Sequence, residues 1–136
     1  MRLPSLIATV LIAASAHAVA AYPEKPIKIV MGFPAGGPLD QHARLLTDKL
    51  QAVLGQPFIV DYKPGAGGTL GAESVARGPA DGDTIMLANT GVMVINGALY
   101  SKLPYNTLKD VGSIARTAQQ PLALLVNNNV PAKNLK

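Results

Sequence analysis

The chain has 136 residues, of which 49% are hydrophobic and 15% are charged, a balance that suits one globular domain rather than a disordered chain. Its 12 Lys and Arg residues outweigh 8 acids without forming a basic run interleaved with aromatic residues, so nucleic acid is not an expected partner. The sequence contains no cysteine, which excludes a disulfide, a thiolate zinc site and a cysteine nucleophile.

The first 21 residues have the pattern of a secretory signal peptide. Arg2 precedes an apolar stretch at 6–14, and four alanines follow between positions 16 and 21. A membrane anchor is the alternative, but polar residues interrupt a segment already short for a span of about 30 Å. We expect cleavage after Ala21, although cleavage after Ala18 also fits. Because no cysteine follows the cut, the mature protein is not expected to be a lipoprotein. The predicted export would make it a soluble periplasmic protein outside the cytoplasm.

The rest of the chain repeats one order of elements: an apolar strand, a loop of small and polar residues, and a helix. We expect strands at 27–31, 58–62 and 84–88, loops at 32–38, 63–71 and 89–91, and helices at 39–55, 72–78 and 92–100. Strands that alternate with helices and are apolar throughout predict an α/β fold, with a parallel sheet covered by helices on both faces.

The three loops are expected to meet at one edge of this sheet. Right-handed crossovers place every strand-to-helix loop at the carboxyl ends of the strands, where open α/β sheets bind ligands. Each helix start also offers free N–H groups and a positive dipole end, so the edge favours an anion. Gly36 and Gly37 would let the backbone approach that anion, and Pro38 suits a first helical turn. Asp40 either stabilises that turn or contacts the ligand.

The loop sequences argue against a nucleotide as this anion. Gly32 and Gly37 have the spacing of a phosphate loop, but Pro38 and Leu39 occupy its lysine and hydroxyl positions. The glycines of the second loop are one residue off the dinucleotide fingerprint, and no acid closes the following strand. Because the first loop also lacks Lys and Arg, we expect a carboxylate held by neutral amides and hydroxyls.

Catalytic arrangements are not indicated either. His42 lies two positions beyond Asp40, so on a helix the two side chains diverge and form neither a relay nor a metal pair. We expect His42 to be a solvated helix residue. The serines lie in no nucleophile elbow. Asn89 and Thr90 have an alternative role as simple turn and cap residues. We therefore predict neither an enzyme nor a metal or cofactor site.

Four segments in order resemble a known family: "YPEKPIKIVMGFPAGGPLDQHARLLTDKL", "LGQPFIVDYKPGAGGTLGAESVARGPADGDTIMLANTG", "INGALYSKLPYNTLKDVGSIAR" and "VNNNVPAKNLK". Together they resemble the tripartite tricarboxylate transporter solute-binding receptors, the Bug or TctC-like family. The resemblance implies a periplasmic receptor without catalytic activity, built like a type II-like periplasmic binding protein from two α/β lobes that close over a carboxylated metabolite. Its implied partners are that ligand and the membrane subunits of the transporter, and the full-length receptor is expected to be a monomer.

The resemblance places ligand contacts in all three loops, largely through main-chain amides. They would be Phe33, Gly36, Gly37, Pro38, Leu39 and Asp40 in the first loop, Ala66, Gly67, Gly68 and Thr69 in the second, and Asn89, Thr90 and Gly91 in the third. Two departures from the family pattern lie in the first loop. Gly32 stands where proline is usual, and Leu39 stands where a small hydroxyl residue is common, so the usual ligand selectivity is in question.

Length is the larger departure, because family members are more than twice as long. The resemblance divides the chain into a signal peptide at 1–21, an N-terminal lobe at 22–118, and a crossover strand with the start of a second lobe at 119–136. We therefore expect an amino-terminal lobe alone, with a sheet edge left unpaired. The alternatives are a remnant that binds no ligand, a module that contacts a sensor partner and, less favoured, an exported nucleotide-binding enzyme.

Overall fold

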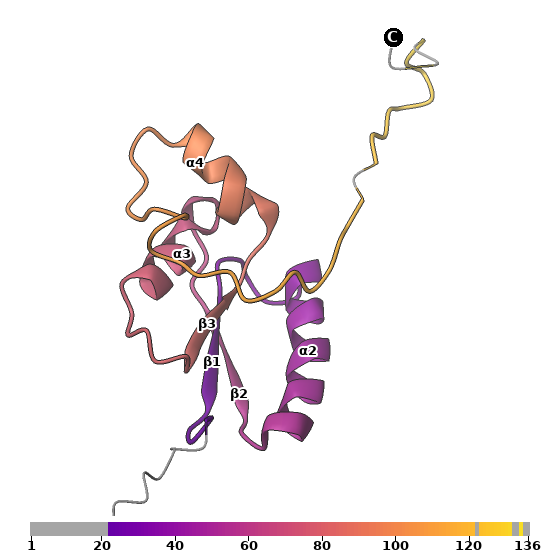
Figure 1. The fold of residues 1–136 in the computed structure, drawn as a ribbon. Coiled ribbons are helices and arrows are strands. Elements are labelled where there is room, and N and C mark those ends of the chain that lie inside the picture. The colour runs from indigo at the N-terminus through magenta and orange to yellow at the C-terminus, as the bar shows by residue number, and fades with distance from the viewer. Residues whose placement is uncertain (1–21, 122, 132–133, 135–136) are drawn as a thin grey trace, which may run out of the picture.

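Figure 1 shows the computed structural model of the protein, which describes residues 22–121, 123–131 and 134. The predicted signal peptide lies outside the described residues. The elements in chain order are β1 (Ile27–Met31), α2 (Pro38–Leu54), β2 (Phe58–Tyr62), the 3₁₀ turn η1 (Ala66–Gly68), α3 (Thr69–Ala76), β3 (Thr84–Leu87), the π-helical turn η2 (Gly91–Ile95) and α4 (Asn96–Leu99).

The three strands form one parallel sheet in the order β2-β1-β3. The first two strands have the predicted bounds, and the third ends one residue earlier than predicted. Met31 pairs with Tyr62 of β2 on one side and with Leu87 of β3 on the other. Because these three residues end their strands, the loops that follow all leave the sheet at the same level.

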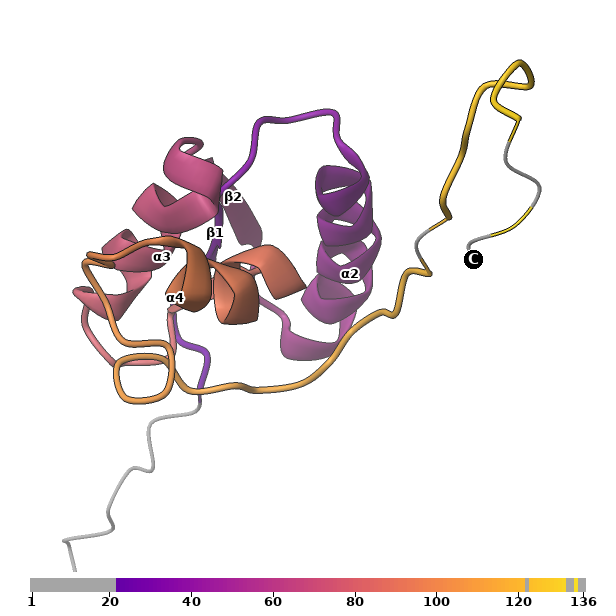
Figure 2. The ribbon, with the colours of Figure 1, turned by 90° about the horizontal axis from the view of Figure 1, so that it is seen from above.

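Helices cover both faces of the sheet, as predicted. Figures 1 and 2 show α2 on one side of the strands, with α3 and α4 on the other. Beneath α2 lies one buried cluster, made of Ile29, Met31 and Ala43. On the other face Ala72, Val92 and Tyr105 form a second cluster. Fully burying a side chain of this size contributes about 1.5–3 kcal/mol, so the central strand and its two helical layers form the stable part of the fold.

Helix α2 begins and ends where its sequence signals predict. Gly37 is the N-cap residue and Pro38 takes the first helical position, where its missing N–H removes no helical hydrogen bond. Gly55 ends the helix in the left-handed conformation, with φ of 71°, and its N–H bonds to the carbonyl oxygen of Gln51. The helix starts at Pro38, one residue before the predicted start, and its last residue is Leu54.

The other helical segments differ from the prediction. Helix α3 starts at Thr69, three residues earlier than predicted, because the left-handed turn before it is complete at Gly68. The predicted helix at 92–100 is divided into the π-helical turn η2 and the short α4. Such π-helical turns are frequent at functional sites.

The described residues after Leu99 contain neither a helix nor a strand. In Figure 1 this part of the chain crosses toward α2, where Thr117 Oγ1 lies 3.0 Å from Nε2 of His42. His42 is half-buried and its contact with Thr117 lies at the exposed surface, so the side chain is both partly solvated and bonded. The crossover strand at 119–136 and the lobe boundary at 118 stay predictions. The helices that the structure describes are all too short or too polar to span a membrane.

Candidate functional site

The first two loops touch through their backbones at the carboxyl edge of the sheet. A Cβ atom on Gly32 would lie 2.7 Å from Cα of Gly68, and one on Gly71 would lie 2.9 Å from Cα of Gly32. Real Cβ atoms do not approach backbone atoms this closely, so the contact depends on glycine at these positions. The proline that is usual in the family at position 32 would require the two loops to move apart.

The third loop and its helical segment close against the same contact. A Cβ atom on Gly68 would lie 2.6 Å from Cγ2 of Val92 and 3.2 Å from Cε2 of Phe33. Nδ2 of Asn96 donates to the carbonyl oxygen of Gly67 over 3.1 Å and to Oγ1 of Thr69 over 3.3 Å. The fold therefore brings all three predicted loops together.

The second loop has an unusual backbone. Gly65, Ala66, Gly67 and Gly68 all have positive φ, at 134°, 47°, 62° and 88°. Among the described residues, Ala66 is the one with a positive φ that is not glycine. Holding an L-amino acid in this left-handed conformation costs about 1–2 kcal/mol of conformational free energy. Strained backbone of this kind gathers at ligand clamps and active sites. Ala66 and Gly67 are exposed at this edge, whereas Gly68 is buried.

Three of the predicted ligand residues already have partners within the protein. Phe33 packs against the buried cluster on the α3 face, and Leu39 packs against the cluster beneath α2. The hydroxyl of the buried Thr69 accepts the hydrogen bond from Asn96. These side chains therefore shape the loops from the inside, and their role as ligand contacts stays a prediction.

The third loop uses its asparagine as a cap. Oδ1 of Asn89 accepts a hydrogen bond from the N–H of Val92 over 3.1 Å, which is the capping role that the sequence left as an alternative. A Cβ atom on Gly91 would lie 3.1 Å from the same Oδ1 atom. Asn89 and Thr90 are both exposed, so the loop lies on the surface beside the second loop.

Asp40 is the most constrained polar residue of the site, with 3% of its surface exposed. Its Oδ2 atom accepts bonds from the N–H of Gly36 over 2.9 Å and from Nε of Arg44 over 3.1 Å. Its Oδ1 atom accepts the hydroxyl of Tyr62 over 2.5 Å. These bonds, led by that of Tyr62, hold the pKa of Asp40 below its usual value. Asp40 is the acidic residue in the first turn of α2, as one of the two sequence readings has it, although its side chain does not cap the helix; its role as a ligand contact stays a prediction.

Sequence reasoning missed Arg44, Tyr62 and Asn96. Arg44 follows Asp40 by four residues on a helix, a spacing that favours an ion pair and could have been noticed. An asparagine within the apolar helical segment 91–99 could also have been taken as a sign of a buried hydrogen bond. Tyr62 carries no local signal, because it reaches Asp40 only through the pairing of β1 with β2.

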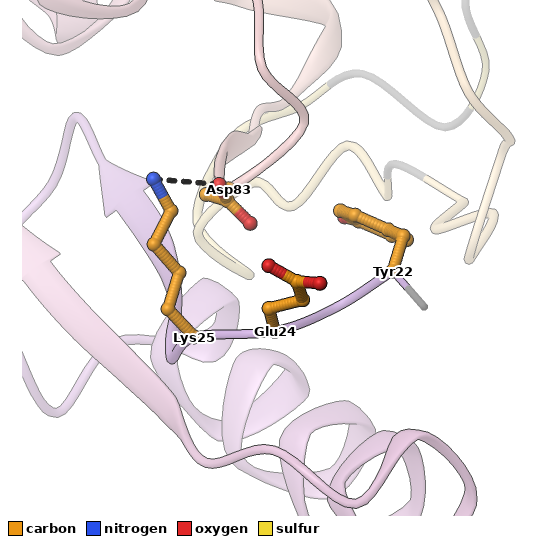
Figure 3. A pocket seen from close by; sticks show the side chains of 4 residues that line it. All are labelled: Tyr22, Glu24, Lys25 and Asp83. Carbon is orange, nitrogen blue, oxygen red and sulfur yellow. Dashed lines mark ion pairs between the residues drawn. The ribbon is translucent and has the colours of Figure 1, made fainter. Parts of the chain in front are cut away.

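A pocket lies at the opposite end of the sheet, lined by Tyr22, Glu24, Lys25 and Asp83 (Figure 3). Nζ of Lys25 lies 2.8 Å from Oδ2 of Asp83. The hydroxyl of Tyr22 donates to the carbonyl oxygen of Gly82 over 2.7 Å. The bond to Asp83 is the main reason that the pKa of Lys25 is raised. This cluster anchors the segment before β1 to the segment before β3.

Residues 42–136 match the family of tripartite tricarboxylate transporter receptors. The chain belongs to this receptor family. It is 37% identical over 133 residues to a UPF0065 protein of Bordetella bronchiseptica. That alignment covers 96% of the chain but 40% of the relative, so the receptor chain spans about two fifths of the relative's length. The protein BugT of Bordetella pertussis is also 37% identical, over 115 residues that cover 84% of the receptor chain and 35% of BugT.

Solved structures of the same fold hold small dicarboxylates. MatC of Rhodopseudomonas palustris, solved with bound malate, is 39% identical with a TM-score of 0.63, and Rpa4515 of R. palustris, solved with adipate, is 32% identical with a TM-score of 0.62. The match to MatC covers 65% of the receptor chain and 30% of MatC, and the match to Rpa4515 covers 64% of the receptor chain and 29% of Rpa4515. The family and the α/β fold expected from the sequence are thereby confirmed, and they are those of solute-binding receptors.

Proposed function

We propose that the chain forms one wall of a periplasmic binding site for a small dicarboxylate, which the receptor delivers to a tripartite tricarboxylate transporter. The observation that carries this proposal is the contact of the glycine loops at the carboxyl edge of the sheet, through Gly32, Gly68 and Gly71. Membership of the receptor family and the malate and adipate of two structural relatives support the ligand class.

Neutral donors would hold the ligand. The first turn of α2 has an N–H group at Leu39 that lacks an acceptor within the helix, and the positive end of the helix dipole lies with it. Lys63, the first residue of the second loop, is engaged within the protein: its ammonium donates to Oγ of Ser74 over 2.8 Å and lies 3.8 Å from Oδ2 of Asp61. Backbone amides, with bridging water, therefore suit a carboxylate better than a phosphate that seeks a basic side chain.

Binding is tested by following backbone amide signals of the mature chain in NMR spectra while malate or adipate is added to millimolar concentration. We expect the amides of Gly37, Gly67 and Gly91 to shift together and to saturate. The matched controls are malamide and adipamide, which keep the carbon chain and remove the charge. The proposal would be contradicted if the backbone amide signals of the loops did not shift with either acid. It would also be contradicted if they shifted equally with malamide and adipamide.

Export is the second part of the proposal. The charged start, apolar stretch and alanines at 1–21 suit a signal peptide that is removed after Ala21. Cleavage after Ala21 would keep Tyr22, whose hydroxyl donates a hydrogen bond to the carbonyl oxygen of Gly82, as the first residue of the mature chain. Mass spectrometry of the protein recovered from the periplasm should give the mass of residues 22–136. Recovery with residues 1–21 still attached would count against cleavage at this site.

A further inference from the structure

We propose that Asp40, Arg44 and Tyr62 form a clasp that holds Gly36, and with it the first loop, in the conformation that receives the ligand. Asp40 is then a positioning residue and not a ligand contact. The effect of the clasp on affinity rests on the proposed function, because the shape of the loop can affect affinity only if the loop binds a ligand. The clasp itself concerns the ligand-free chain and can be tested without any ligand.

Both oxygens of the Asp40 carboxylate are engaged by donors from the protein. Oδ2 accepts from Gly36 N–H and from Nε of Arg44, and Oδ1 accepts from the hydroxyl of Tyr62. An Nη atom of Arg44 also lies 3.2 Å from that hydroxyl, which closes the ring of contacts. With 3% of its surface exposed, Asp40 has little access left for a ligand atom.

The space around Gly36 and Gly37, in the turn that the clasp holds, is open. A Cβ atom on Gly36 would meet nothing within 4 Å, and one on Gly37 would meet only the carbonyl oxygen of Pro34, at 3.9 Å. Gly36 also has a left-handed φ of 87°, a conformation that a free glycine leaves readily. The bond from Gly36 N–H to Asp40 is therefore the contact that selects this turn from the alternatives open to it.

Charge balance gives the clasp a second role. An unpaired buried carboxylate beside the loop would repel an anionic ligand, and leaving it unpaired would also be costly. Among the described residues, the charged or titratable groups that contact Asp40 are Arg44 on α2 and Tyr62 on β2, while the first loop contributes only a backbone N–H. Arg44 neutralises the charge of Asp40. It lies on the solvent side of the carboxylate, with 64% of the Arg44 side chain exposed.

The first test measures the clasp in the ligand-free chain by amide hydrogen exchange and NMR. Asp40→Asn and Tyr62→Phe should each speed the exchange of the Gly36 amide and move its signal. The control Asp48→Asn removes the same charge from an exposed position on the same helix and should leave Gly36 unchanged. The Gly36 signal should also titrate with Asp40, at a pH below the usual aspartate range. Unchanged Gly36 exchange in both clasp variants would overturn the proposal.

The second test measures malate affinity in the same variants. Loss of a bond that fixes the loop should weaken binding about tenfold in Asp40→Asn and Tyr62→Phe. Asp48→Asn and Tyr22→Phe, the latter at the opposite end of the sheet, should bind like the parent chain. Equal malate affinity in Asp40→Asn and the parent would overturn the positioning role. If the parent bound no dicarboxylate while Gly36 exchange still depended on Asp40, the carboxylate function would fail and the clasp would stand.

Discussion

The side-chain amide of Asn96 donates a hydrogen bond to the carbonyl oxygen of Gly67 over 3.1 Å, although 29 residues separate the two in sequence. The same nitrogen reaches Oγ1 of Thr69. One buried side chain from α4 thereby satisfies two acceptors around the left-handed turn of the second loop. Because that turn is strained at Ala66, a fixed partner on the opposite side stabilises a conformation that the loop would leave in isolation.

We predict that Asn96→Ala lowers the free energy of unfolding by about 1–3 kcal/mol, because it leaves the buried hydroxyl of Thr69 and the carbonyl oxygen of Gly67 without this donor. Urea denaturation followed by circular dichroism measures the change. Asn128→Ala removes the same side chain from an exposed turn and should change stability little. Equal effects of the two substitutions would argue that the bond to Gly67 contributes nothing to the folded state.

Gly68→Ala should be more disruptive, for two reasons that act together. Gly68 has φ of 88°, and its added Cβ would lie 2.6 Å from Cγ2 of Val92. We expect a loss of about 2 kcal/mol or more in the free energy of unfolding. Gly112→Ala serves as the control, since a Cβ atom there meets nothing within 4 Å. A Gly68→Ala protein as stable as this control would show that the loops can separate without cost.

The stability of the protein should depend on pH through Asp40. Its pKa is lowered in the folded state, chiefly by the hydroxyl of Tyr62, so folding favours the ionised form. The resulting stabilisation is complete above the usual aspartate pKa of about 3.9 and disappears as the pH falls through the lower folded value. Urea unfolding should therefore separate the parent chain from Asp40→Asn at pH 7, with the difference shrinking in strong acid. A difference that stays constant across this acid range would be inconsistent with the clasp.

The sequence was most informative where the determinants are local. Apolar runs located the strands at 27–31 and 58–62, and Pro38 and Gly55 marked the ends of α2, because each signal acts within a turn of the residue that carries it. Strand and helix alternation then predicted the parallel sheet and the meeting of the loops. The start of α3 was missed because four successive residues adopt positive φ, an arrangement that glycine permits but does not demand.

The bond between Tyr62 and Asp40 could not be predicted, because it depends on the register of the sheet. Tyr62 meets Asp40 only because β1 pairs with β2 so that Met31 lies beside Tyr62, which places the end of β2 next to the start of α2. The sequence assigned Asp40 to a helix start correctly. The spacing of Asp40 and Arg44 could also have indicated their ion pair, but the bonds from the phenol and the loop amide had no local signal.

The last prediction concerns Gly37, which we expect to face the ligand. Gly37 has φ of −78°, and a Cβ atom there would meet only the carbonyl oxygen of Pro34, at 3.9 Å. Valine at this position requires no left-handed backbone and meets little of the protein, so Gly37→Val should lower the free energy of unfolding by about 1 kcal/mol or less, the cost of a poorer N-cap residue. Its side chain would nevertheless fill the approach to the amides at the start of α2, and binding of malate and adipate should be lost. Calorimetry or NMR titration measures the affinity, and urea unfolding checks the fold.

Gly36→Ala is the matched comparison, because it strains a left-handed residue and should lose about 1 kcal/mol of stability while blocking less of the approach. Undiminished dicarboxylate binding by Gly37→Val would mean that the ligand does not rest on this helix start.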